Sequence, residues 1–182
     1  MSVPKIVLEH YRSPRNKRAI PGGHAGTVEG REDGKALTVF VRVEGGTIVD
    51  ASFTNTGDRM DDPGASALTE ILRGLTLDEA SRLTVVDVAS RLESGANPGI
   101  AIVAHEALRL ALHAARGVAP PPRGRLICHC FHVHEDRIRR YVRERGLKSV
   151  DEVRSWTRAN SGCRSCRPDI EAIIAQELSR PR

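Results

Sequence analysis

The sequence of 182 residues is poor in aromatic side chains, which make up 3% of it, and its four cysteines all lie in the last third. So few aromatics argue against a surface that stacks on nucleic-acid bases. There is no run of about 18 apolar residues that would predict a membrane span. The opening stretch, MSVPKIVLEHYRSPRNKR, lacks the uninterrupted apolar segment of a secretory signal. We therefore expect a cytoplasmic protein that binds neither nucleic acid nor membrane.

The net charge of +5 is spread unevenly along the chain. Residues 1–122 carry 14 basic and 15 acidic side chains, whereas residues 123–167 carry 12 basic and 5 acidic ones. The positive charge therefore surrounds the cysteines. A local excess of this kind indicates an anionic cofactor or an acidic protein partner.

Three consecutive prolines, Pro120 to Pro122, interrupt the chain. No helix or central strand continues through such a stretch, which favours an extended conformation. The sequence thus predicts a first domain over residues 1–117, a linker over 118–125 and a second domain over 126–182.

The first domain has the pattern of an α+β fold, a small antiparallel sheet followed by packed helices. Apolar residues alternate over residues 37–43, and a glycine turn at 44–47 leads to a second strand over 48–54. Helices are expected over 62–72, from the capping box of Thr76 and Glu79, around 86–92, and over 100–115.

The second domain is expected to be small and all-helical. A short apolar segment at 126–130 precedes a helix over 135–146. A second helix is capped by Ser149 with Glu152, and a third begins at Pro168. The cysteines then lie on two loops, before the first and the last of these helices.

The cysteines form a Cys-x-Cys pair and a Cys-x-x-Cys pair separated by 32 residues. In a reducing compartment such a group indicates metal binding before disulfides. Four thiolates suit a [2Fe-2S] cluster, and structural zinc is the rival, although its ligand pairs usually have two to four residues between them. The candidate metal and cofactor ligands are Cys128, Cys130, Cys163 and Cys166.

Positive groups are placed where an anionic cluster needs them. Arg164 and Arg167 flank Cys166, and the helix that follows points its N-terminal dipole toward the sulfurs. Neutralising these arginines is expected to lower a reduction potential. Three histidines also crowd the first cysteine pair, but four cysteines complete the ligand count, so we interpret them as loop residues: His129, His132 and His134.

The segment from Leu126 to Ile174, LICHCFHVHEDRIRRYVRERGLKSVDEVRSWTRANSGCRSCRPDIEAII, resembles the bacterioferritin-associated-ferredoxin-like [2Fe-2S] domain found within NifU-like proteins. The first domain is similar to the NifU and IscU scaffold domain through EHYRSPRNKR, GTIVDASFTNTG, SALTEILRGLTLDEA and HEALRLAL. The resemblance implies a [2Fe-2S] cofactor, a role in iron-sulfur cluster assembly, a cysteine desulfurase or related scaffold as partner, and a homodimer.

The resemblance fails at the scaffold's own cluster site. Aligned with the family, the three cysteine positions hold Asp33, Asp58 and Ile100, and Lys35 replaces the aspartate. Asp33 and Asp58 could still bind a hard cation, but carboxylates beside a lysine are more often surface charges. The segment over 59–64 replaces a small-residue loop, which predicts a remodelled pocket.

We expect a NifU-like [2Fe-2S] protein that is not an enzyme, since no nucleophile arrangement or phosphate-binding loop stands out. It would serve cluster assembly or its redox support, with the first domain kept for docking and dimerisation. Two alternatives stay open: a ferredoxin-like electron carrier for a partner outside assembly, and a zinc-stabilised interaction module.

Overall fold

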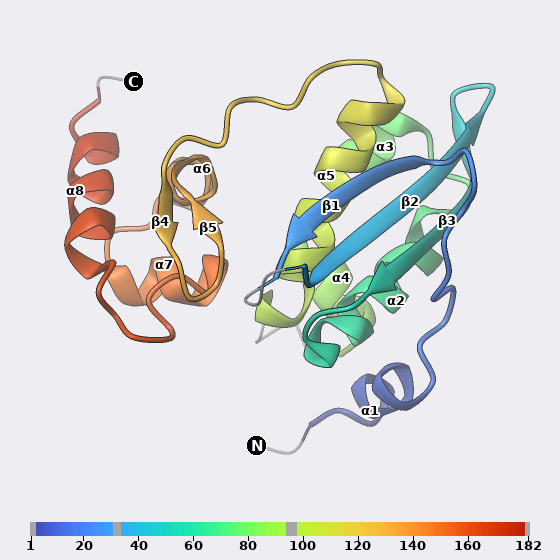
Figure 1. The fold of residues 1–182 in the computed structure, drawn as a ribbon, viewed down its shortest axis with the longest axis horizontal. Helices are drawn as coiled ribbons and strands as arrows, with labels where there is room; N and C mark the ends of the chain where they lie inside the picture. Colours follow the sequence, from blue (N-terminus) through green and yellow to red (C-terminus); the bar gives the residue numbers. More distant parts are fainter. Residues whose placement is uncertain (1–2, 31–33, 94–97, 181–182) are drawn as a thin grey trace. The chain divides into compact units, whose positions relative to one another are not determined.

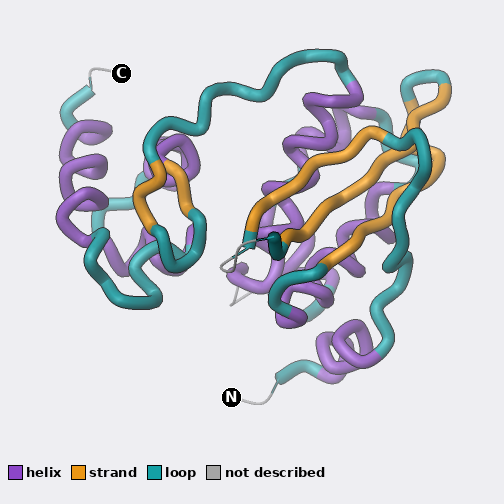
Figure 2. Tube along the Cα trace, in the orientation of Figure 1, coloured by secondary structure: helices purple, strands orange, loops and turns teal. Residues whose placement is uncertain are grey.

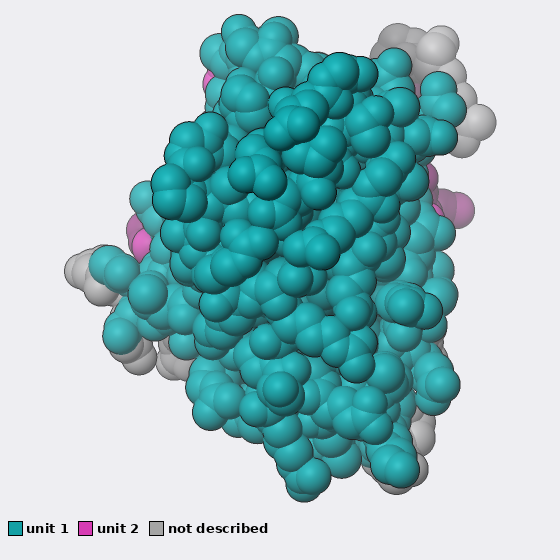
Figure 3. Space-filling model, turned by 90° about the vertical axis from the view of Figure 1, so that its right-hand side faces the viewer, with its two compact units in different colours: residues 1–120 teal, residues 121–182 magenta. Residues whose placement is uncertain are grey.

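The computed structural model describes residues 3–30, 34–93 and 98–180. The chain divides into two compact units, residues 1–120 and 121–182, coloured separately in Figure 3. The division falls inside the linker predicted at 118–125. Within the described residues, no helix is long and apolar enough to cross a membrane.

Unit 1 is built on a three-stranded antiparallel sheet, β1 (His24–Glu29), β2 (Ala36–Glu44) and β3 (Thr47–Asn55), in that order. The β2–β3 hairpin predicted from the sequence is confirmed. It turns at Gly45 and Gly46, whose φ angles of 57° and 80° are accessible to glycine at little cost. A register shift between Arg42 and Val43 marks an irregularity in β2 where it pairs with β3.

Helices cover one face of this sheet, as Figure 1 shows for α2, α4 and α5. The predicted helix over 62–72 and the capping box of Thr76 with Glu79 are both present. The helices of unit 1 are α1 (Lys5–Arg12), η1 (Arg59–Asp61), α2 (Asp62–Leu72), α3 (Leu77–Arg82), α4 (Val85–Arg91), η2 (Pro98–Ala101) and α5 (Ile102–Ala115).

The core of unit 1 lies between the sheet and these helices. Val39, Val41 and Phe53 from the strands and Leu68 and Leu108 from the helices are all almost fully buried. The apolar alternation in β2 therefore points to the core, as the sequence pattern predicted.

Unit 2 comprises α6 (Glu135–Arg145), α7 (Val150–Thr157) and α8 (Arg167–Leu178). The capping box of Ser149 and Glu152 is confirmed, and α6 ends at Gly146 in the left-handed conformation. The buried residues that these helices share are Ile138, Val142, Val153, Ile170 and Ile173.

The helical prediction for unit 2 needs one addition, a small antiparallel ribbon visible in Figure 2. It pairs β4 (Leu126–Cys128) with β5 (Val133–His134). The ribbon is too short to leave an alternating pattern in the sequence. It turns the chain back between its strands, and so it fixes the position of Cys128 and Cys130.

Candidate metal centre

The four cysteines come from two loops of unit 2. Cys128 ends β4, and Cys130 lies in the turn between β4 and β5. Cys163 lies in the loop between α7 and α8, and Cys166 is the residue just before α8. The helices α6 and α7 between the loops bring them together, which is the arrangement that the sequence predicted.

The sulfurs meet across the two loops rather than within each sequence motif. The Sγ atoms of Cys130 and Cys163 are 3.3 Å apart. The thiols of Cys128 and Cys166 are also hydrogen-bonded to each other. Each contact thus joins one cysteine of the Cys-x-Cys motif to one cysteine of the Cys-x-x-Cys motif.

The two sulfur contacts differ in their exposure to solvent. Cys128 and Cys166 are 2% and 5% exposed, and we call them the buried pair. Cys130 is half-buried and Cys163 is exposed, and we call them the exposed pair. One side of the site therefore lies in the protein interior and the other at its surface.

This asymmetry extends to the thiol acidities. Burial, together with the neighbouring Cys128, raises the pKa of Cys166 to about 11. Hydrogen bonds from the side chain and backbone of Ser165, and then from Cys130, lower the pKa of Cys163 to about 7. The exposed side of the site thus favours a thiolate, which is the form that binds metal.

Space for the exposed pair depends on Gly162. A Cβ at this position would lie 2.8 Å from the Sγ and 2.9 Å from the Cβ of Cys130. Only glycine lets the Cys163 loop approach the Cys130 loop this closely. The close approach of the loops, the meeting of four sulfurs and the donors beside Cys163 together fit an iron-sulfur cluster held by thiolates.

Other predicted groups take part less directly. His129 is exposed, and His132 and His134 are half-buried. Arg164 is exposed, and Arg167 pairs with Glu171 at 2.8 Å. Cys166 has the N-cap position of α8, but its sulfur makes no capping hydrogen bond, so the predicted contact between first-turn N–H groups and this sulfur is not observed.

Across the described ranges, no three histidine, cysteine, aspartate or glutamate side chains are grouped as a site for a single metal ion. In unit 2 the cysteine sulfurs instead meet two by two, in the contacts given above.

In unit 1, the positions aligned with the scaffold's ligands lie on neighbouring loops. Asp33 is outside the described residues. Asp58 is exposed and accepts a hydrogen bond from the Met60 N–H at 2.9 Å, which caps η1. Lys35 is exposed near Gly57, and Gly64 packs against the carbonyl group of Ile100.

The segment around Asp58 is held by a polar network that the sequence did not reveal. Asn55 Nδ2 donates to the Asp58 carbonyl and to Asp62 Oδ1, each at 2.8 Å. Asp62 is fully buried and pairs with Lys17 Nζ at 2.8 Å. Asp58 thus serves a structural role at the start of η1, whereas the metal-binding role considered for it stays a prediction.

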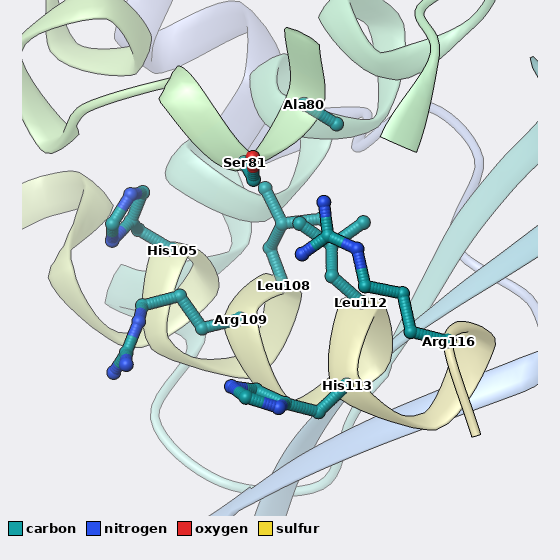
Figure 4. A pocket seen from close by; sticks show the side chains of 8 residues that line it. All are labelled: Ala80, Ser81, His105, Leu108, Arg109, Leu112, His113 and Arg116. Atoms are coloured by element: carbon teal, nitrogen blue, oxygen red, sulfur yellow. The ribbon is translucent and has the colours of Figure 1, made fainter. Parts of the chain in front are cut away.

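A small pocket of about 80 Å³ in unit 1 contains none of the predicted site residues. Figure 4 shows that α5 supplies most of its lining side chains. Two polar groups at its rim are already bonded to the fold: His105 Nε2 to the Leu83 carbonyl at 2.8 Å and Arg116 Nη2 to Asp78 at 2.8 Å.

Three residues of the centre were not assigned a role from the sequence: Asn160, Gly162 and Ser165. Each acts on a sulfur from the loop that carries Cys163 and Cys166. The sequence signal was the glycine directly before Cys163 and the serine within the Cys-x-x-Cys motif. Neither is specific without the contact that the fold provides.

Comparison with known proteins gives a match for each unit. The family described as the NifU-like N terminal domain matches residues 3–117, and that described as the BFD-like [2Fe-2S] binding domain matches residues 126–176. The nitrogen fixation protein NifU of Trichormus azollae is 35% identical over 184 residues, covering 92% of this chain and 61% of that protein.

Further relatives repeat this pattern. NifU of Azotobacter chroococcum mcd 1 is 31% identical, covering 95% of this chain and 59% of that protein. The iron-sulfur cluster assembly enzyme IscU of Drosophila melanogaster is 35% identical over 92 residues, covering 47% of this chain and 59% of that protein. This chain therefore spans about three fifths of the length of the NifU proteins that it matches. It belongs to the NifU-like family, with a NifU-like N-terminal domain that lacks cysteine followed by a BFD-like [2Fe-2S] binding domain.

Proposed function

We propose that unit 2 holds a permanent [2Fe-2S] cluster on Cys128, Cys130, Cys163 and Cys166, and that the protein uses it in iron-sulfur cluster assembly or its redox support. The observation that carries the proposal is the meeting of four sulfurs from two loops in cross-loop contacts. The match of residues 126–176 to a [2Fe-2S] binding domain supports it.

Such a cluster supplies one-electron chemistry when bound. The residues of this chain bind and shape it. The buried pair anchors the site in the interior of unit 2, where burial disfavours free thiolates and a metal must displace the protons. The exposed pair places the other side at the surface, within reach of a partner.

Unit 1 has a different role in this proposal. It contains no cysteine, and Asp58 is used to cap η1. We assign it docking and dimerisation, with a cysteine desulfurase or a related scaffold as partner. The proposal assigns no catalytic residue to either unit.

A second candidate function is electron transfer to a partner outside cluster assembly. The observation that favours it is the charge of the two cysteine loops: residues 125–134 and 153–168 contain arginine and histidine but no aspartate or glutamate. A surface of this charge suits an acidic redox protein. A zinc-stabilised interaction module is the third candidate, and it would be colourless and redox-silent.

Binding measurements separate the first two candidates. Purified cysteine desulfurase is titrated into the full chain in a calorimeter, and reduction of the holoprotein by an acidic flavoprotein reductase is followed in a parallel experiment. Saturable binding of the desulfurase supports the assembly role. Fast reduction by the flavoprotein, with no heat from desulfurase, would instead support the electron carrier.

A further inference from the structure

Ser165 is the residue within the Cys-x-x-Cys motif that contacts a sulfur. Its Oγ lies 3.0 Å from the Sγ of Cys163, and its backbone N–H is hydrogen-bonded to the same sulfur. Arg164, between them, has a φ of 64°, a left-handed conformation that non-glycine residues adopt infrequently. This turn folds Ser165 back onto Cys163.

The direction of the side-chain hydrogen bond follows from the chemistry of a metal ligand. A cysteine binds metal as a thiolate, which has no proton to donate. The hydroxyl group of Ser165 must then be the donor and the sulfur the acceptor. Hydrogen bonds to a charged acceptor are stronger than neutral ones.

The buried pair has no hydroxyl donor of this kind. The polar side chain beside Cys166 is Asn160, whose Oδ1 lies 4.0 Å from the sulfur and accepts from the thiol. That oxygen cannot donate to a thiolate. The side-chain donor of the site is thus concentrated at the exposed pair.

We propose that Ser165 is a positioning residue that raises the reduction potential of the [2Fe-2S] centre by donating its Oγ–H to Cys163. This inference rests on the proposed function and names a determinant of its redox property. Reduction adds one electron to the centre and moves no atom, so the charge of the cluster with its four thiolates changes from about −2 to about −3. A donor to sulfur stabilises the more negative state more, which favours reduction.

The size of the effect is limited by solvent. Ser165 is exposed, so water can replace part of the lost hydrogen bond when the hydroxyl is removed. The backbone N–H of Ser165 remains in any variant. We therefore expect removal of the hydroxyl to make reduction about threefold to tenfold less favourable, and tenfold corresponds to a shift of about 59 mV for a one-electron couple.

The test uses the full chain with its cluster, titrated with dithionite under argon while the visible absorbance reports the reduced fraction. Ser165→Ala removes the hydroxyl, and Ser165→Thr keeps one. Ser161→Ala removes an exposed serine hydroxyl from the same loop, away from any sulfur contact given for Cys163, and serves as the matched control. Iron and acid-labile sulfide are measured for every variant.

The inference predicts a lower midpoint potential for Ser165→Ala, and wild-type values for Ser165→Thr and Ser161→Ala, at equal cluster content. It is overturned if Ser165→Ala keeps the wild-type potential, or if Ser161→Ala shifts the potential equally. Should the alanine variant not fold, Ser165→Gly replaces it under the same criteria. A wild-type protein without iron and sulfide would instead refute the proposed function, so the two failures are distinguishable.

Discussion

Replacing Gly162 with alanine tests how the fold keeps space for the exposed pair. The φ of Gly162 lies outside the left-handed region, so the alanine variant adds no backbone strain. The whole effect must come from the added methyl group. That group would lie 2.8 Å from the Sγ of Cys130 and 3.5 Å from the ring of Phe131.

The magnitude follows from these distances. Non-bonded carbon contacts are most favourable at about 3.5–4.0 Å, so the Cys130 sulfur and the methyl group must separate by about 0.7 Å or more. Ligand sets tolerate displacements of about 0.5 Å. We expect cluster affinity to fall about tenfold to 100-fold, as for other changes next to metal ligands, and the apoprotein to lose about 1–3 kcal/mol of unfolding free energy.

The assay measures iron and acid-labile sulfide per chain after anaerobic reconstitution, together with the competition of each variant against a chelator. Gly57→Ala in unit 1 is the matched control, since its methyl group would find its nearest neighbour at 3.4 Å, close to ordinary van der Waals contact. Full cluster content with unchanged chelator resistance in Gly162→Ala would refute the packing argument. Equal losses in both variants would also refute it.

Three more results are expected. In the apoprotein at pH 8, iodoacetamide should modify the exposed pair before the buried pair, as read by mass spectrometry of peptides, and equal rates would contradict the burial given above. Asp50→Asn should cost unit 1 about 1–3 kcal/mol at pH 7. Although burial raises the pKa of Asp50, hydrogen bonds and charges from Arg18 and Arg73 lower it overall. This stability is present above pH 3.8 and lost as the pH falls through the lower pKa of the folded state, so thermal unfolding of the variant and the wild type should converge in acid, and a constant difference would contradict the reasoning. Gly26→Ala should destabilise unit 1 by about 1–3 kcal/mol, because the methyl group would overlap the backbone of α5 at Ala107 and Ala111, while the visible spectrum of unit 2 stays unchanged.

Much of the fold was predictable because local signals and tertiary structure agree. The capping boxes that begin α3 and α7 satisfy backbone N–H groups without help from distant residues. The alternation in β2 reflects one buried face, and Gly146 ends α6 as a left-handed cap. In each case the sequence carries the physical cause within a few residues.

The elements that were not predicted depend on distant contacts. The strand β1 contains Gly26, which breaks the apolar pattern because α5 approaches the backbone there. The helix α1 is tied to the fold by the buried His10, whose Nδ1 lies 2.8 Å from the Ser66 hydroxyl. No local pattern encodes either contact.

The same division applies to the candidate site. The four cysteines and the two loops that carry them were predictable from spacing and helix caps. The pairing across loops was not, because it depends on how the ribbon β4–β5 and the turn at Arg164 orient the sulfurs. The roles of Gly162 and Ser165 follow only from distances of about 3 Å to sulfur atoms.

The most direct test of the account is the metal content of the full chain, purified without oxygen and analysed for iron, zinc and acid-labile sulfide, with its visible absorption spectrum. The account predicts two irons and two sulfides per chain, with absorption that bleaches on reduction by dithionite. A colourless protein with one zinc ion per chain, and neither iron nor sulfide, would contradict it.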